Sequence, residues 1–310
     1  PAYSMSSDSR RRLQILIAFA VVYLVWGSTY LGIRIGVRDI PPAMLAGVRN
    51  LVAGLVIIGI ACVRERTWPG NARSWLHALV MGVLMVAAGN GLVTWAEVEL
   101  PSNQAALIAS TSALWVAWFG TLGPRRHALS LRVKIGLLVG FAGTALMLVP
   151  GAHFALGHFS AQLLILVSSL CWGIGVIYGR SFSLDISPLL LSGMLLFCGG
   201  ALLTIIGVAT GEPAHWHWSM LGIGALVYLT VFGSCLAYST YVWLIHHVTP
   251  DKLSTTAYVN PAIALVLGWA VLDEQVQGLR LLGMLVILLG VILVTTRYGV
   301  SFRRWMKTGA

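Results

Sequence analysis

Charged residues are scarce in this chain of 310 residues, where Asp, Glu, Lys and Arg together make up only 10%. Soluble domains carry about 25% charged residues, so the chain has too few charges to cover a surface that faces water on all sides. Hydrophobic residues make up 58% instead, in long runs separated by short polar breaks. Because a membrane-spanning helix needs about 20 apolar residues, these runs predict a membrane protein without a separate soluble domain.

Cysteine is also rare, and the motifs of metal sites and enzymes are missing. The four cysteines lie inside apolar runs and form no C-x-x-C pair: Cys62, Cys171, Cys198 and Cys235. This pattern is typical of small packing residues and argues against a disulfide framework, a metal site or a cofactor. Neither H-E-x-x-H nor G-x-G-D occurs, so the sequence does not indicate a membrane enzyme.

The apolar runs predict ten transmembrane helices, and therefore an all-α polytopic membrane protein. The predicted spans are residues 13–33, 43–63, 75–98, 104–122, 131–149, 160–179, 188–209, 219–245, 253–271 and 280–296. Proline and glycine clusters such as Pro41–Pro42 and Pro150–Gly151 mark the gaps between them. Runs of this length and continuity favour helices, because the strands of a membrane barrel are shorter and alternate in polarity.

Lysine and arginine are distributed unevenly over the two sides of these spans. Sixteen of the twenty fall on one side of the spans, whereas Arg34, Arg38 and Arg280 fall on the other and Arg49 lies within a span. The positive-inside rule places the basic side, with both termini, in the cytoplasm of an inner (plasma) membrane protein. The net charge of +10 is then a topology signal and does not indicate binding of nucleic acid.

The two halves of the chain resemble each other in order and spacing. Leu24–Gly27 matches Leu170–Gly173, Pro101 matches Pro250, and two glycines of the fifth span match two of the tenth, at offsets of 146 to 149 residues. Each half holds five spans, so the second half enters the membrane from the opposite side. Inverted repeats of this kind are typical of transporters with a substrate site between the repeats.

The predicted boundaries follow from this repeat. Residues 13–150 form the first five-helix repeat and residues 151–297 the second, between a cytoplasmic tail at 1–12 and a basic cytoplasmic tail at 298–310. Pro1–Ser4 precede Met5 and are interpreted as an artificial extension.

Several short motifs support a family resemblance. They are the Trp26–Gly27 opening, Arg49 within Gly47–Asn50, and Asn260–Pro261 followed by the Asp273–Glu274 turn. With the paired halves, they make residues 13 to 297 resemble the EamA-type ten-helix exporters of the drug/metabolite transporter (DMT) superfamily. The resemblance implies export of amino acids, drugs or related metabolites through a central cavity lined by spans other than the fifth and tenth.

The first half departs from the family pattern at two places. Ser112 stands where the second half has Pro261, and Gly123–Arg125 stands where the family often has a Gly-Glu turn. Helix ends in the first half are therefore expected to differ from those in the second.

Arg49 is the first candidate binding residue, since a charge inside a span is costly and faces a cavity or a partner. Its guanidinium could anchor a substrate carboxylate in a bidentate pair, or it could pair structurally with a helix end or with Glu97.

Aromatic and polar side chains inside the spans complete the predicted substrate site. Trp26, Trp115 and Trp172 lie away from the interfacial belt and either line a cavity or pack between helices. The further candidates are Asn90, Thr94, Trp95, Tyr238 and Tyr258. Asn90, Thr94 and Glu97 share one helical face, which indicates either cavity lining or hydrogen bonding between helices. Pro261 is expected to bend the ninth span, as a hinge or as a simple bend.

The acidic residues limit the possible sources of energy. None of the ten acids lies in the middle third of a predicted span, so Glu97, near the outer end of the third span, is the candidate for coupling to protons. Without coupling to protons, the protein would be a facilitator or an exchanger.

The predicted function is export of small organic metabolites by alternating access, with amino acids, aromatic or apolar ones included, as the best-fitting substrates. Drug or nucleotide-sugar carriers on the same fold are alternatives, although a diphosphate would need more cations than Arg49. A membrane enzyme or a channel is the alternative from another class. The predicted partners are the small-molecule substrate and the lipid bilayer. The G-x-x-x-G spacing of Gly32/Gly36 and Gly136/Gly140 leaves monomer or weak homodimer open.

Overall fold

The computed structural model describes residues 7–66, 68–120, 130–148, 156–182, 186–248, 253, 255–274 and 279–295. Within these residues, all regular elements are helices. The first half contains α1 (Ser7–Gly36), α2 (Pro42–Arg64), α3 (Ala72–Met81), η1 (Gly82–Gly91), α4 (Leu92–Ala96), α5 (Ser102–Ala109), α6 (Ser112–Phe119) and α7 (Leu131–Leu148). The second half contains α8 (Leu156–Ser181), α9 (Pro188–Ala209), η2 (Glu212–His215), α10 (Met220–Tyr228), η3 (Leu229–Tyr238), α11 (Ser239–His247), α13 (Thr256–Leu272) and α14 (Leu279–Thr295).

Six of the helical segments are long and apolar enough to cross a membrane. They cover Arg10–Gly36, Pro42–Arg64, Ala72–Ala96, Phe159–Ser181, Pro188–Ala209 and Met220–His247. The other four predicted spans correspond to shorter helices: α5 with α6, α7, α13 and α14. The all-α polytopic fold predicted from the sequence is confirmed.

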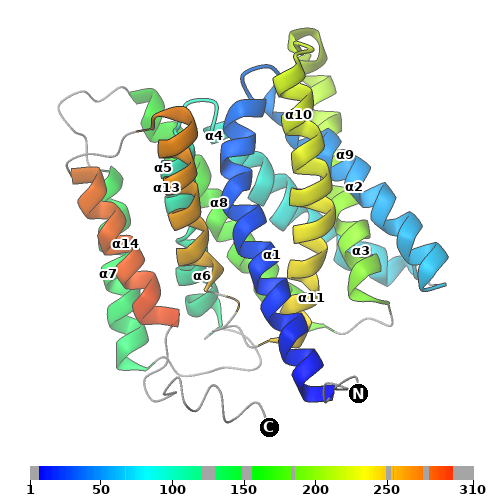
Figure 1. Ribbon diagram of the computed structural model, residues 1–310, viewed down its shortest axis with the longest axis horizontal. Coiled ribbons are helices and arrows are strands. Elements are labelled where there is room, and N and C mark those ends of the chain that lie inside the picture. Colours follow the sequence, from blue (N-terminus) through cyan, green and yellow to red (C-terminus); the bar gives the residue numbers. More distant parts are fainter. Residues whose placement is uncertain are drawn as a thin grey trace, which may run out of the picture.

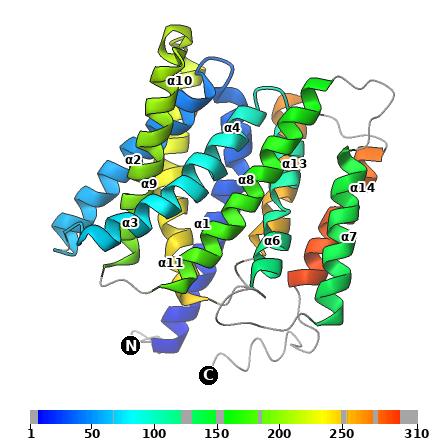
Figure 2. The same cartoon turned by 180° about the vertical axis from the view of Figure 1, so that it is seen from behind.

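The contacts between helices repeat when the two halves are exchanged. α2 packs against α9 and α7 packs against α14, so that each of these pairs joins equivalent helices of the two halves. α1 contacts η3 and α13, and its counterpart α8 contacts η1 and α6. Figure 1 and the opposite view in Figure 2 both show α7 and α14 side by side at one end of the bundle. This pattern is the one expected of inverted repeats.

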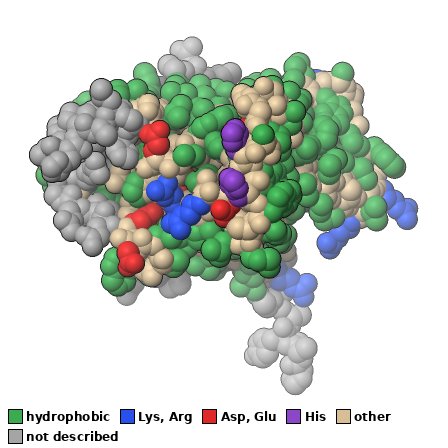
Figure 3. Space-filling model, turned by 90° about the horizontal axis from the view of Figure 1, so that it is seen from above, with side chains coloured by type: hydrophobic (Ala, Val, Ile, Leu, Met, Phe, Trp, Pro, Cys, Tyr) green, Lys and Arg blue, Asp and Glu red, His purple; other side chains and the backbone are tan. Residues whose placement is uncertain are grey.

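Both ends of the described chain lie on one side of the bundle. α1 begins, and α14 ends, at the lower side of Figure 1. We call this side the inner end and the opposite side the outer end, following the orientation predicted from Lys and Arg. Seen from the outer end, acidic, basic and histidine side chains lie among hydrophobic ones (Figure 3), and Arg38, Glu99, His215 and His217 are exposed there. Large apolar side chains such as Leu138 and Leu285 are exposed on the flanks, as lipid contact requires.

Glycines allow the paired helices to approach each other closely. A Cβ atom on Gly200 would lie 2.3 Å from the backbone nitrogen of Leu51, across the contact of α9 with α2. A Cβ on Gly290 would lie 2.4 Å from the Cα of Gly140, across the contact of α14 with α7. Small residues at helix crossings stabilise membrane proteins by bringing backbones into contact.

The glycines whose four-residue spacing leaves a homodimer open pack inside the chain. Gly136 and Gly140 face α14 and Leu114, and Gly32 and Gly36 face Leu229 and Leu45. Their four-residue spacing thus serves helix packing within the chain, and monomer or weak homodimer stays a prediction.

Glu212 fixes the start of the helix that bears Arg49. α2 begins after Pro41 without a side-chain cap of its own. The carboxylate of Glu212 instead accepts hydrogen bonds from the backbone nitrogens of Ala43, at 3.2 Å, and Met44, at 2.8 Å. An acidic side chain at a helix N-terminus also interacts favourably with the helix dipole.

Glu212→Ala is therefore expected to lower the free energy of unfolding by about 1–2 kcal/mol, the usual loss for a helix cap. The melting temperature of purified protein in detergent measures this effect. Glu99→Ala is the matched control, since Glu99 is exposed at the same end. Equal melting temperatures for the two variants would contradict the capping role.

Candidate functional site

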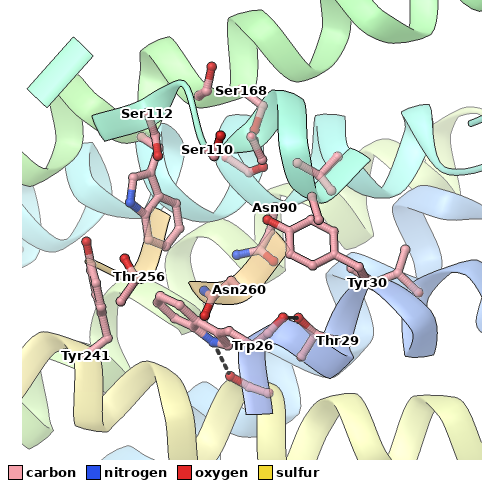
Figure 4. A pocket seen from close by; sticks show the side chains of 18 of the residues that line it. Trp26, Thr29, Tyr30, Asn90, Ser110, Ser112, Ser168, Tyr241, Thr256 and Asn260 are labelled. Atoms are coloured by element: carbon pink, nitrogen blue, oxygen red, sulfur yellow. Dashed lines mark hydrogen bonds between the residues drawn. The ribbon is translucent and has the colours of Figure 1, made fainter. Parts of the chain in front are cut away.

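A cavity lies at the centre of the bundle, between the two halves. It has about 850 Å³ of space free of atoms, including the part that is open at its mouth. Helices α1, α2, η1, α4, α5, α6, α8, η3, α11 and α13 contribute described residues to its wall, whereas α7, α9 and α14 contribute none of theirs. Figure 4 shows side chains from several of these helices pointing into one space.

Arg49 supplies the one charged side chain among the described residues that line this cavity. It lies on α2 and is only 2% exposed. Its Nη2 atom donates a hydrogen bond of 2.7 Å to Oδ1 of Asn90, and its Nε has no hydrogen-bond partner. The structural alternative required Arg49 to pair with a helix end or with Glu97. Arg49 forms a hydrogen bond with neither. A buried guanidinium with an unused donor can bind an anionic oxygen.

Two π-helices place polar side chains beside Arg49. η1 covers Gly82–Gly91 and η3 covers Leu229–Tyr238, at an offset of 147 residues at both ends. Asn90 lies near the end of η1, and Tyr238 is the last residue of η3. The hydroxyl of Tyr238 is buried without a hydrogen-bond partner, close enough to Arg49 for electrostatic interaction. π-Helical turns are frequent at functional sites, and here they occur at equivalent places in both halves.

Aromatic rings form one wall of the cavity. The ring of Trp26 lies 5.5 Å from that of Trp172, 5.7 Å from that of Tyr238 and 4.6 Å from that of Tyr241, measured between centroids. The indole nitrogen of Trp26 donates to the carbonyl oxygen of Gly233 in η3, at 3.2 Å (Figure 4). These mutual contacts hold the rings in place as a preformed apolar surface.

Hydroxyl groups form the opposite wall, where the fourth predicted span is broken. α5 ends at Ala109 and α6 begins at Ser112. The hydroxyls of Ser110 and Thr111 donate to carbonyls of α5, at 2.6 and 2.7 Å. Ser110 and Ser112 line the cavity, as do Ser168 and Ser169 of α8. Sequence reasoning missed these serines, because one serine in an apolar helix usually serves packing; the run Ser110–Ser112 was the available signal.

The second half has Pro261 at the equivalent place. α13 continues through this proline, which cannot donate the backbone hydrogen bond that an α-helix needs there. Pro261 lines the cavity together with Asn260, whose Oδ1 is buried without a partner. Ser112 and Pro261 are 149 residues apart, so in both halves the regular helical hydrogen bonding is incomplete at the cavity.

The predicted binding residues divide into three groups. Five of them line the cavity: Trp26, Arg49, Asn90, Trp172 and Tyr238. Three lie elsewhere, as described next. For Tyr258, the side chain lies outside the described residues.

Thr94, Trp95 and Trp115 do not line the cavity. Thr94 is fully buried, and its hydroxyl donates to the carbonyl oxygen of Asn90 at 2.8 Å, within its own helix. Trp95 packs against the hydrophobic core. The ring of Trp115 contacts Phe141 of α7, at 4.9 Å between centroids. Of the three residues on one helical face, Asn90 lines the cavity, whereas Thr94 and Glu97 do not.

A second, smaller hollow continues the cavity toward the inner end. Its wall shares Ser112, Trp172, Tyr241, Thr256 and Ala257 with the central cavity. It adds residues such as Val176 and Leu253, which lie closer to the inner ends of α8 and of the ninth span. At the outer end, Glu97, Ser102 and Asn103 are fully buried, so the helix ends are closed over the cavity there.

Comparisons with known proteins agree with this architecture. The profile of the EamA-like transporter family matches the chain twice, over residues 13–149 and 159–296. The uncharacterized inner membrane transporter YedA of Escherichia coli K12 is 35% identical over 288 residues, which cover 92% of either chain. The uncharacterized transporter YvbV of Bacillus subtilis is 26% identical over 94% of either chain. The WAT1-related protein At3g02690 of Arabidopsis thaliana is 24% identical over 88% of this chain and 67% of its own.

A solved crystal structure shows the same fold. It has a TM-score of 0.68 to this chain at 20% sequence identity, and the match covers 92% of this chain and 98% of the other.

Proposed function

The chain belongs to the EamA-like transporter family. We propose that it exports small metabolites bearing a carboxylate, above all amino acids. The protein is a membrane transporter; the proposal concerns its substrate, its direction and its mechanism. The analogy with YedA, which is named an inner membrane transporter, supports an inner-membrane location. The asymmetry of Lys and Arg supports cytoplasmic termini.

The observation that most supports this substrate class is the isolated positive charge in the cavity. Arg49 has an unused Nε donor, and the hydroxyl of Tyr238 lies unpaired close to it. A carboxylate could accept hydrogen bonds from both groups, with the charge-assisted geometry that guanidinium favours. Asn90 would hold the guanidinium in position through the bond it already makes.

The two remaining walls suit the rest of an amino acid. The rings of Trp26, Trp172 and Tyr241 offer an apolar surface for an aromatic or aliphatic side chain. The hydroxyls of Ser110 and Ser112 and the unpaired Oδ1 of Asn260 offer hydrogen-bond acceptors for an ammonium group.

The repeated architecture supports transport by alternating access. Equivalent helices of the two halves surround the cavity, so the same contacts can form at either end in turn. The cavity continues toward the inner end in this structure while the outer end is closed. In an exporter, this is the conformation that takes up substrate from the cytoplasm. The interruptions at Ser112 and Pro261 are suitable hinges, since they break the regular hydrogen bonding of two helices.

Counterflow in proteoliposomes tests the proposal. Vesicles are preloaded with unlabelled amino acids, and labelled ones are added outside without any ion gradient. A carrier gives transient, saturable accumulation of label, whereas a channel gives neither saturation nor counterflow. If folded protein accumulates none of the proteinogenic amino acids, the amino-acid assignment is wrong and drugs become the next class to test.

A nucleotide-sugar carrier is the less favoured candidate on this fold. A diphosphate needs several positive groups, and Arg49 is the one cation among the described residues that line the cavity.

A further inference from the structure

Among the acidic side chains that the structure describes, Glu97 stands out because it is fully buried and has no hydrogen-bond partner. It follows α4 at the outer end, where it is completely buried. Neither of its carboxyl oxygens has a hydrogen-bond partner. It also does not line the central cavity, whose nearest wall residue on α4 is Val93, one helical turn away.

The basic residues near Glu97 are occupied with other groups. Arg34 of α1 donates hydrogen bonds to the backbone carbonyls of Glu97, at 2.5 Å, and Val98, at 2.8 Å. Arg49 of α2 donates to Asn90. Both guanidinium groups act on Glu97 only from a distance, and neither contributes a hydrogen bond to its carboxyl group.

A second carboxyl group near Glu97 disfavours a negative charge there. Glu274, in the turn after α13, accepts hydrogen bonds from the backbone nitrogens of Ser102, at 2.8 Å, and Asn103, at 3.1 Å. It also accepts one from the hydroxyl of Ser102, at 2.9 Å. These bonds hold the Glu274 side chain at the start of α5. Tyr30 of α1, a neutral group, completes the titratable neighbours of Glu97.

The buried unpaired side chains of the two helices next to α4, namely α5 and α8, are neutral amides. Both helices pack against α4. Asn103 of α5 is fully buried, with neither side-chain atom hydrogen-bonded, and Oε1 of Gln162 of α8 is also buried without a partner. Burying an unpaired carboxylate costs far more free energy than burying the neutral acid. The surroundings of Glu97 therefore favour its protonated form in this conformation.

This group of unpaired polar side chains is explained if it is hydrated in another conformation. In a rigid protein, each buried polar group without a partner lowers the stability of the fold. In a carrier, however, the outer helix ends must separate, and water then reaches residues that are buried when the ends are closed. Glu97, Asn103 and Gln162 come from three helices that meet at the outer end.

We propose that Glu97 is a proton-binding site in the gate that closes the outer end of the cavity. When the gate opens, the carboxyl group is hydrated and releases its proton to the outer solution. When the gate closes, the carboxylate takes up one proton from the same side before it is buried. The inference rests on the proposed function only in that the protein alternates between two openings; it does not depend on the substrate.

The direction of the pH dependence follows from this proton balance. The closed state binds one proton more than the open state, so an acidic outer solution favours closure and an alkaline one favours opening. Glu97→Gln resembles the protonated acid at every pH. It is therefore expected to keep the outer end mostly closed and to remove the dependence on outer pH.

Thiol labelling from outside measures the opening directly. Asn103→Cys places a reporter beside the gate, and intact cells are treated with a membrane-impermeant maleimide in acidic or alkaline buffer. The native chain, whose four cysteines are partly buried, gives the background. Thiol reactivity itself rises with pH. The labelling rate of the Asn103→Cys protein is therefore divided, at each pH, by the labelling rate of the double variant Asn103→Cys with Glu97→Gln.

This ratio is expected to lie near one in acid and to rise several-fold in alkaline buffer. Glu99→Gln is the matched control, because Glu99 is exposed two residues away; it should leave the ratio unchanged. A ratio that stays at one at every pH would contradict the proposal, as would a reporter that is never labelled. Gln162→Cys provides a second reporter in case the first does not fold. Labelling needs no substrate, so a failure of amino-acid counterflow leaves this test intact.

Discussion

Arg49→Ala is expected to lower the apparent affinity of counterflow for carboxylate-bearing substrates about tenfold or more, in protein that still folds. The substitution removes the one cation among the described residues that line the cavity. Hydrogen bonds to charged groups contribute about 1.5–3 kcal/mol each, which corresponds to about tenfold to more than a hundredfold in apparent affinity. Counterflow at several concentrations of labelled substrate measures this loss.

Two further variants separate anchoring from general damage. Arg49→Lys keeps the positive charge but cannot form the bidentate pair, so it should recover only part of the affinity. Arg38→Ala removes an exposed arginine at the outer end and should leave counterflow unchanged. The anchoring role would be refuted if Arg49→Ala retained native affinity, or if it and Arg38→Ala were equally impaired.

Gly200→Ala is expected to prevent stable folding, although it adds only one methyl group. Its Cβ would lie 2.3 Å from the backbone nitrogen of Leu51 and 2.7 Å from the carbonyl carbon of Asn50. Backbone atoms cannot rotate away as a side chain can, so α2 and α9 must separate. Overpacking costs about 1–3 kcal/mol when side chains can adjust, and a backbone clash is expected to cost more. The same separation would displace Arg49, one residue before Asn50 on α2.

Gly59→Ala is the control for this prediction, since Gly59 also lies on α2 and a Cβ there would meet no atom within 4 Å. Removing this glycine should be neutral or slightly stabilising, because alanine restricts the unfolded chain. The yield of monodisperse protein and its melting temperature measure both variants. Native stability of Gly200→Ala would show that α2 and α9 are not held at this contact.

The fold could be predicted from the sequence because the lipid bilayer imposes a simple rule on every membrane-spanning segment. Every span must bury its backbone polar groups in a helix, so the apolar runs and the breaks between them predict the helices and their order. The irregular places could not be predicted in this way. The break between α5 and α6 and the π-helices η1 and η3 depend on packing between halves, to which hydropathy is insensitive.

The candidate site was predictable where a side chain is costly in lipid. Arg49 and Trp26 stand out in apolar runs for this reason, and both line the cavity. Thr94 and Trp115 have polar groups too, but the hydroxyl of Thr94 is satisfied within its own helix and Trp115 packs on Phe141. Whether a side chain faces the cavity or a neighbouring helix depends on the rotation of each helix, which the π-helical turns change locally.

The central claim is that the cavity binds a carboxylate at Arg49, and competition in counterflow tests it most directly. Labelled phenylalanine is exchanged by the native protein in the presence of unlabelled phenylalanine or of phenylalaninamide, in which the carboxylate is replaced by a neutral amide. The account predicts that phenylalanine competes and that the amide does not. Equal competition by both compounds, in protein that shows counterflow, would contradict it.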